Sequence, residues 1–287
     1  MSLADDFQYQ YVVGQMRPDF PALLARFQRA SDALAASTSN AQFDQRYGGA
    51  EREVYDFFPA QGPVRGHLVY FHAGYWQSRD KALFRWLAGA FTAQGIDVFL
   101  VNYPLCPDVA LASLTDSARR ATRAIAVRVG ASGQPLVVAG HSAGAHLATE
   151  MALTPGLGLR GEGGAPPNVH AIVALAGIYD LAPLTATTLN DRLRLDDPAA
   201  RANSPLWRVA GGAPPALFAV GAEETAQFHE QATRMHHAWR AAGMASEVVA
   251  VPAAHHFSLL QDWASPTGTL AKPMQRLWDQ ARRAAIV

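Results

Sequence analysis

The sequence is poor in the features that mark several common classes of protein. It has one cysteine, Cys106, in 287 residues, which excludes an internal disulfide and a cysteine-rich metal site. No apolar run approaches the ~20 residues needed to span a bilayer. The 24 Lys and Arg residues balance 24 Asp and Glu residues, and no run of like charge stands out. This balance argues against nucleic acid or an anionic membrane as the main partner.

The first six residues also lack the basic segment and apolar core of a secretory signal. We therefore expect a soluble, cytoplasmic globular protein that acts on a small molecule. The sequence is compatible with a homodimer but does not show one. Cys106 lies in the segment Pro104-Leu105-Cys106-Pro107, which we expect to be a loop. We expect its side chain to be packed rather than reactive.

Apolar residues are abundant, at 49% of the chain, and they are arranged in a regular alternation. Short apolar runs, typical of buried strands, alternate with segments of helical periodicity. The expected strands cover 66–71, 96–101, 135–139, 171–176, 216–220 and 247–251, with an edge strand over 51–58. The expected helices cover 81–93, 113–129, 143–153, 227–242 and 270–285. This order predicts an α/β fold with a mainly parallel sheet and helices on both faces.

We expect one domain over residues 1–287, to which the remaining segments are added. Residues 1–50 form a leader that packs on the body or contributes to a lid, with a short strand at 7–11 and a helix at 22–35. Residues 154–168 form a Gly/Pro-rich loop, and residues 181–212 form a small cap insertion. In the 113–129 helix, Ser113 and Asp116 resemble a capping box and Gly130 fits the position after the last turn.

The pentapeptide at 140–144, GHSAG, stands between an expected strand and an expected helix. In that context G-x-S-x-G forms a nucleophile elbow, in which a tight turn projects the serine hydroxyl. Gly140 and Gly144 keep the flanks free of bulk. Ser142 is therefore the candidate nucleophile.

A serine nucleophile needs a base, an acid that orients the base, and donors for the oxyanion. The base should follow the last strand, where both His255 and His256 stand. For the acid, the spacing G-x-x-[DE] after the 216–220 strand favours Glu224 over Glu223. Asp180, one strand earlier, is the third alternative, although a turn or helix cap is its simpler interpretation.

The oxyanion donors should be backbone N–H groups near the developing charge. One is expected from Ala143, directly after the nucleophile. The others are expected from Gly74 and Tyr75, in the loop HAGYW at 72–76 that ends the 66–71 strand. An ordinary turn is the alternative interpretation of this loop.

Several motifs together resemble the kynurenine formamidase (arylformamidase) branch of the α/β-hydrolase superfamily. The loop HAGYW is similar to the H-G-G-x-W loop of that branch, GHSAG matches its elbow, VGAEE at 220–224 is similar to its acid-bearing segment, and His256-Phe257 looks like its histidine segment. The resemblance covers most of the chain and favours His256 over His255. Two positions depart from it: Ala73 replaces a glycine, and Glu224 replaces the aspartate of the animal enzymes.

The resemblance implies an α/β-hydrolase fold and a serine hydrolase of small aryl formamides or carboxylic esters, with the triad Ser142, His256 and Glu224. No metal or organic cofactor is needed. Tyr75, Trp76 and Phe257 are expected to wall an aromatic substrate pocket, with core packing as the alternative. The rival functions are a general short-chain carboxylesterase, an acyltransferase, and a catalytically dead ligand-binding homologue.

Overall fold

The computed structural model describes residues 6–162 and 168–285, and its centre is one eight-stranded sheet. The strand order is β1-β2-β4-β3-β5-β6-β7-β8, in which β1 and β2 pair antiparallel and the neighbours from β4 to β8 pair parallel. The strands are β1 Gln42–Arg46, β2 Val54–Phe58, β3 Gly66–Phe71, β4 Ile96–Val101, β5 Leu136–His141, β6 Ala171–Leu175, β7 Ala216–Gly221 and β8 Ser246–Val251.

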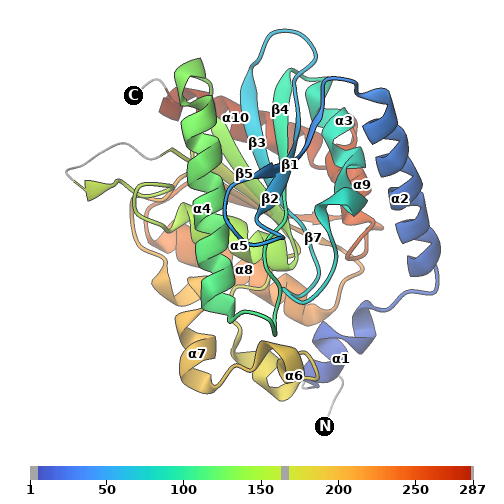
Figure 1. Ribbon diagram of the computed structural model, residues 1–287. Helices are drawn as coiled ribbons and strands as arrows, with labels where there is room; N and C mark the ends of the chain where they lie inside the picture. The colour runs from blue at the N-terminus through green and yellow to red at the C-terminus, as the bar shows by residue number, and fades with distance from the viewer. Residues whose placement is uncertain (1–5, 163–167, 286–287) are drawn as a thin grey trace.

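Helices cover both faces of this sheet (Figure 1). One face carries α4 Leu111–Val129, α5 Ala143–Ala152 and α8 Ala226–Ala241. The other face carries α2 Phe20–Ser37, α3 Trp86–Thr92, α9 Leu259–Ala264 and α10 Ala271–Ala285. Within the described ranges, none of these helices combines the length and the apolar character that a bilayer-crossing segment requires.

The sequence of the central strands explains their place in the sheet. Every residue of β3, β4, β5, β6 and β7 is buried, as expected for strands that are covered on both faces. Parallel pairing sets Phe71 beside Gly140 and Gly221 beside Val251. The loops that follow β3, β5, β7 and β8 therefore meet at one edge of the sheet, where ligands bind in open α/β folds.

The N-terminal leader differs from the expectation. Residues Phe7–Tyr11 form helix α1 rather than a strand, because Asp6 caps the first turn by accepting from Tyr9 N at 3.1 Å. Tyr11 is completely buried, and its hydroxyl accepts from Gln231 Nε2 at 2.8 Å. The edge strand also differs from the expectation. Strand β1, which was not predicted, pairs with β2 and takes the edge position that the sequence had given to β2.

Three local predictions on helices are wrong. Helix α4 begins at Leu111, with Ala110 before it, so Ser113 lies inside the first turn and is no cap. Gly130 keeps a helical φ of −57°, and the left-handed residue is Gly133, at φ +64°, after a short 3₁₀ turn. The expected 81–93 helix divides into η2 Lys81–Phe84 and α3, and α9 was not predicted.

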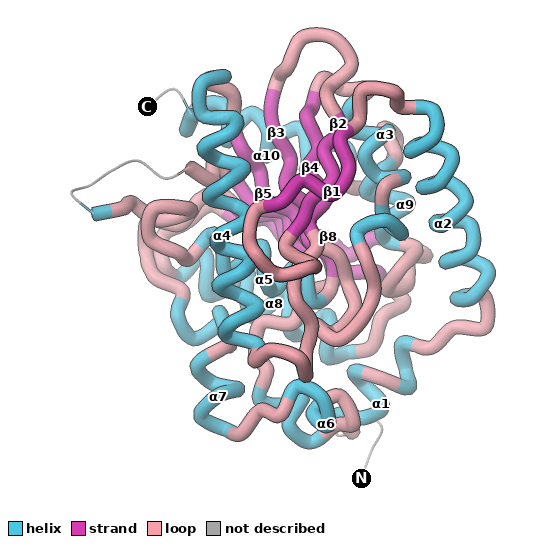
Figure 2. The backbone as a smooth tube through the Cα atoms, viewed as in Figure 1, coloured by secondary structure: helices cyan, strands magenta, loops and turns pink. Residues whose placement is uncertain are grey.

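Residues 181–212 form four short helical pieces, which are η5 Ala182–Ala186, α6 Asn190–Leu193, α7 Asp197–Ala202 and η6 Pro205–Arg208. Figure 2 shows α6 and α7 at the lower end of the molecule, with α6 between α7 and α1 in this view. Residues 1–5, and residues 163–167 within the expected 154–168 loop, lie outside the described part of the chain.

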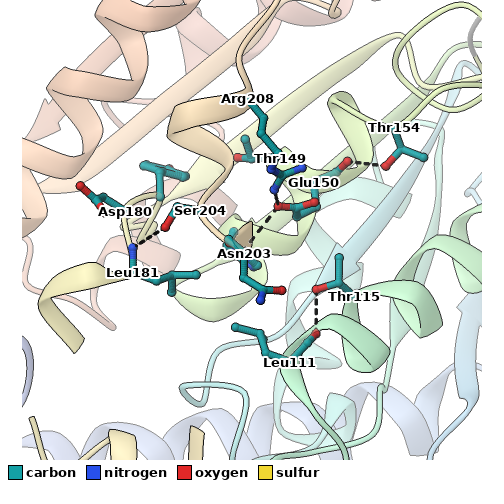
Figure 3. Close-up of polar contacts among 12 residues, drawn as sticks. Leu111, Thr115, Thr149, Glu150, Thr154, Asp180, Leu181, Asn203, Ser204 and Arg208 are labelled. Carbon is teal, nitrogen blue, oxygen red and sulfur yellow. Dashed lines mark hydrogen bonds and ion pairs between the residues drawn. The ribbon is translucent and has the colours of Figure 1, made fainter. Parts of the chain in front are cut away.

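Polar contacts attach this segment to α5, the helix that follows the GHSAG turn (Figure 3). Arg208 forms an ion pair with the buried Glu150, and His146 Nε2 donates to Asn203 O at 2.8 Å. Within the segment, Ser204 Oγ accepts from Leu181 N at 2.8 Å. Buried polar groups are costly unless they are paired, so these contacts fix the position of the segment on α5.

Candidate active site

Ser142 occupies the sharp turn between β5 and α5. Its φ of 57° and ψ of −117° lie outside the regions that a serine ordinarily adopts. Its backbone N–H donates to Leu175 O at 2.8 Å, which holds the strained turn against the end of β6. This is the conformation expected of a nucleophile elbow, in which the side chain projects from the turn.

The two elbow glycines are required by close packing rather than by a positive φ. A Cβ at Gly140 would lie 1.9 Å from Gly144 O, and a Cβ at Gly144 would lie 1.9 Å from Phe71 O. Neither space could accept a methyl group without moving backbone. The glycines therefore let the start of α5 approach the end of β3.

His256, in the loop after β8, contacts a carboxylate from the loop after β7. Its Nδ1 lies 2.6 Å from Glu224 Oε2, and both side chains are buried. The other carboxylate oxygen of Glu224 accepts from Gly221 N at 2.9 Å. The carboxylate accepts a hydrogen bond from Nδ1 and thereby favours the tautomer with the proton on Nδ1. In this tautomer Nε2 can accept a proton.

The alternative acids and the alternative base lie in other contacts. Glu223 is half exposed and faces Arg17 at 3.9 Å. Asp180 pairs with Arg234 at 3.1 Å, and His255 lies 3.7 Å from the exposed Asp19. Among the candidates, Glu224 is therefore the carboxylate that the fold brings to His256.

The loop after β3 adopts a strained backbone. Gly74 has φ +137°, and a Cβ there would lie 2.1 Å from Ser78 O. Tyr75 has φ +50°, and its hydroxyl donates to Tyr11 O of the leader. Within residues 6–162 and 168–285, the backbone N–H groups of Gly74, Tyr75 and Ala143 have no hydrogen-bond acceptor. These three N–H groups, predicted as oxyanion donors, are thus free to bind a ligand.

His72 supports the same loop from inside the core. Its Nδ1 donates to Ala73 O at 2.8 Å, and its ring stacks on Tyr103 with centroids 4.4 Å apart. Burial lowers the pKa of His72 to about 4, so the side chain is neutral at physiological pH. His72 therefore acts as a fixed hydrogen-bond donor to the loop.

His141, inside the elbow, has a contact that the sequence did not indicate. The side chain of His141 is completely buried. Its Nε2 donates to His256 O at 2.7 Å, and the two rings lie 4.7 Å apart. Burial is the main cause that lowers the pKa of His141 well below its usual value. A neutral His141 thus fixes the backbone of His256.

Ser142 and His256 line one cavity of about 270 Å³. Gly74, Tyr75 and Phe257 also line it, together with Ala73 at the position that departs from the formamidase pattern. The residues that sequence reasoning missed come from three segments: Val12, Gln15, Met16 and Phe20 from the leader, Ser78 and Arg79 from the loop after β3, and Leu189 from the 181–212 segment. No local sequence motif identifies these residues as part of a pocket.

Trp76 was predicted to line the pocket, and this prediction is wrong. Its side chain is completely buried and packs edge-on against His146, with ring centroids 5.1 Å apart. Two left-handed residues in a row, Tyr75 at φ +50° and Trp76 at φ +60°, turn the tyrosine to the cavity and the indole to the core. Core packing, the alternative interpretation, accounts for Trp76.

Other candidate features lie away from this site. A larger hollow of about 610 Å³ contains neither Ser142 nor His256, and several of its charged residues form ion pairs, as Lys81 does with Asp44 at 2.7 Å. Cys106 is buried, and burial raises the pKa of its thiol to about 11. A high thiol pKa opposes reactivity, in agreement with the expectation for this residue.

Comparison with known proteins places this arrangement in a family. A family model described as alpha/beta hydrolase fold matches residues 68–260. The kynurenine formamidase of Danio rerio is 27% identical over 250 residues, which cover 85% of this chain and 84% of that protein. The kynurenine formamidase of Drosophila melanogaster is 27% identical over 229 residues, which cover 76% of this chain and 75% of that protein.

Solved structures agree with this result. A candidate thioesterase from Silicibacter sp. has a TM-score of 0.81 at 27% identity, over 93% of this chain and 98% of that chain. Esterase B from Lactobacillus rhamnosis has a TM-score of 0.67 at 18% identity, over 93% of this chain and 97% of that chain, and so shares the fold. The fold class predicted from the sequence is confirmed. Since the matched residues 68–260 include the strained elbow, the carboxylate and the histidine described above, this chain belongs to the α/β hydrolase fold family.

Proposed function

We propose that the protein is a serine hydrolase that cleaves small aryl formamides or carboxylic esters through an acyl-enzyme on Ser142. One observation carries the proposal. Ser142 and His256 line the same cavity, and Glu224 contacts the second ring nitrogen of His256 at 2.6 Å. A nucleophile, a base and an orienting acid in that relation are the requirement for acyl transfer through serine.

In the proposed reaction, Ser142 Oγ attacks the carbonyl carbon while His256 Nε2 takes the hydroxyl proton. The bond to the leaving amine or alcohol then breaks, and the imidazolium gives that proton to the departing group. Water attacks the acyl-enzyme with His256 as base, and the carboxylic acid leaves. Glu224 accepts from Nδ1 throughout and stabilises the imidazolium. The scheme needs no metal or organic cofactor.

The oxyanion of each tetrahedral intermediate would be held by the backbone N–H groups of Ala143, Gly74 and Tyr75. Each such donor is worth about 3–4 kcal/mol of transition-state stabilisation in serine hydrolases. The strained backbone of Gly74 and Tyr75 supports this role, because strain held by the surrounding fold is common where donors are preorganised. We also propose that the described part of the leader covers the site, since Val12, Met16 and Phe20 line the cavity.

Aryl formamides are the substrate class we favour, because two relatives that match three quarters or more of this chain are kynurenine formamidases. Small carboxylic esters are the second candidate. The Silicibacter neighbour, at the same 27% identity and a TM-score of 0.81, is named as a candidate thioesterase, and thioesters and esters are both cleaved by acyl transfer. The methyl group of Ala73 lines the cavity and is the first feature to examine if formamides are poor substrates.

The first experiment compares kcat/KM for N-formylkynurenine and p-nitrophenyl acetate, with Ser142→Ala as the control. We expect a preference for the formamide of about a hundredfold or more, which corresponds to about 2.7 kcal/mol. Turnover of the ester alone would reject the formamide assignment and leave the serine mechanism in place. Activity near wild type in Ser142→Ala would reject the mechanism.

A fluorophosphonate probe separates these outcomes from a catalytically dead site. We expect the probe to add to the wild-type protein and not to Ser142→Ala, which intact-mass measurement would resolve. A wild-type protein that neither labels nor turns over any ester or formamide would instead be a ligand-binding homologue. Comparing water with an added acceptor alcohol would detect an acyltransferase.

A further inference from the structure

Arg79 places a positive charge in the lining of the cavity. It lies in the loop after β3, five residues beyond Gly74, and has a left-handed φ of +74°. It lines the same cavity as Ser142 and His256. A non-glycine residue is rarely held in this conformation unless the surrounding structure requires it. The surrounding structure therefore holds the Arg79 backbone in a strained conformation, and this conformation sets the direction of the side chain.

The contacts of the Arg79 guanidinium are with aromatic rings. Its Cζ lies 5.0 Å from the ring centroid of Phe257 and 5.4 Å from that of Phe20. In the described part of the chain, the guanidinium has no hydrogen-bond acceptor and no carboxylate partner. Such stacking positions a guanidinium but leaves its N–H donors free to bind an anion.

Other partly buried arginines of this protein have carboxylate partners. Arg85 pairs with Asp56 at 2.7 Å, and Arg119 pairs with Glu150 at 2.8 Å. Arg79 is partly buried as they are, and burial lowers the pKa of its guanidinium. The described lining of the cavity contains no carboxylate that could neutralise it. An arginine placed this way is an anion site that the protein itself does not fill.

The charge also lies on the side of the cavity where the proposed chemistry occurs. Phe257, on which the guanidinium stacks, directly follows His256 in the chain. The Phe257 ring packs against the His141 ring, with centroids 4.9 Å apart. A group held by Arg79 would therefore lie in the same cavity as the proposed base.

We propose that the substrate of this site carries a carboxylate on its leaving group and that Arg79 binds it. The inference rests on the proposed function, in which the acyl group is as small as formyl. A one-carbon acyl group uses little of a cavity of about 270 Å³, so most of the space holds the leaving group. A ring that packs against Phe20 and Phe257 and ends in a carboxylate matches the shape and the charge of that space.

The test uses pairs of substrates that differ in charge and little else. They are 3-formamidobenzoate with 3-formamidobenzamide, and 3-acetoxybenzoate with 3-acetoxybenzamide. The measured quantity is the acid-to-amide ratio of kcat/KM within each variant, so a general loss of activity cancels. We expect wild type to prefer the acid by tenfold or more, mainly through KM. Arg79→Gln should reduce this ratio to near one, and Arg79→Lys should retain part of it.

Arg29→Gln is the control, because Arg29 is exposed on α2 and does not line the cavity. The wild-type ratio should persist in that variant. An acid-to-amide ratio that is equal in wild type and Arg79→Gln would overturn the proposal. A wild-type ratio near one would overturn it as well.

Binding measured without turnover separates this proposal from the proposed function. Calorimetry on Ser142→Ala should show that 3-aminobenzoate binds at least tenfold more tightly than 3-aminobenzamide. In the double variant Ser142→Ala/Arg79→Gln the difference should disappear. This result would support the anion site even if no formamide or ester is hydrolysed. Equal binding of the two compounds to Ser142→Ala would reject the site even if turnover is found.

Discussion

At the scale of single residues, the relation between Glu224 and His256 makes the sharpest prediction. Glu224→Gln keeps the size of the side chain but removes the charge that accepts from Nδ1 and stabilises the imidazolium. We expect kcat on the better substrate to fall about a thousandfold or more, as when the acid of a serine triad is made an amide. Steady-state kinetics with urea midpoints would separate this loss from misfolding.

Glu223→Gln is the matched control for that experiment. It makes the same change one residue earlier, on a half-exposed side chain that faces Arg17. We expect its kcat to stay within about twofold of wild type, as for most surface substitutions. If Glu223→Gln lost as much activity as Glu224→Gln, the assignment of the acid would be wrong.

At the scale of elements, the loop after β3 depends on Gly74. In Gly74→Ala the new methyl group would lie 2.1 Å from Ser78 O, at a φ of +137° that alanine rarely adopts. The loop must shift, and the N–H groups of Gly74 and Tyr75 shift with it. We expect a loss of about a hundredfold in kcat, the size associated with one oxyanion donor. KM should change little if the leaving-group side of the cavity is preserved.

Gly130→Ala is the companion control for the loop. Gly130 has a helical φ of −57°, and a Cβ there meets nothing within 4 Å. Alanine should be tolerated or should slightly stabilise the fold, because it restricts the unfolded chain. A Gly74→Ala enzyme as active as Gly130→Ala would remove the loop from the proposed mechanism.

At the scale of the whole molecule, buried neutral histidines couple stability to pH. Burial lowers the pKa of His72, His141 and His146. Below the unfolded value of about 6.5, the unfolded chain binds protons that the folded chain does not, so stability falls as the pH falls. His72, with a folded pKa of about 4, alone accounts for roughly 1 kcal/mol between pH 7.5 and 5.5. Its effect levels off below about pH 4.

Urea unfolding at pH 7.5, 6.5 and 5.5 would measure this dependence. His72→Asn removes the titrating group and retains a donor that can reach Ala73 O. We expect this variant to be less stable than wild type at pH 7.5 but to lose less stability on acidification. His237→Gln, on the exposed face of α8, should keep the wild-type dependence. An identical pH dependence in wild type and His72→Asn would contradict the burial argument.

The sequence predicted the parts of this protein that depend on local pattern. Strands β3 and β4 were predicted with the bounds that the structure has, because a short, mostly apolar run flanked by turn residues is typical of a buried strand. The elbow at Ser142 and the acid Glu224 were proposed from their spacing, whereas position after β8 left His255 and His256 open and the family resemblance favoured His256. The errors fell on helix ends and on the leader, where a strand was predicted and α1 forms.

What the sequence determined by itself was the order of strands and helices, and therefore the edge of the sheet at which the site must lie. Tertiary structure alone decided which of the neighbouring groups meet. Trp76 faces the core, and Arg79 and the leader line the cavity. The physical reason is that hydrophobic periodicity can be recognised within a short segment of sequence. The direction of a loop side chain, in contrast, is set by contacts with segments distant in sequence.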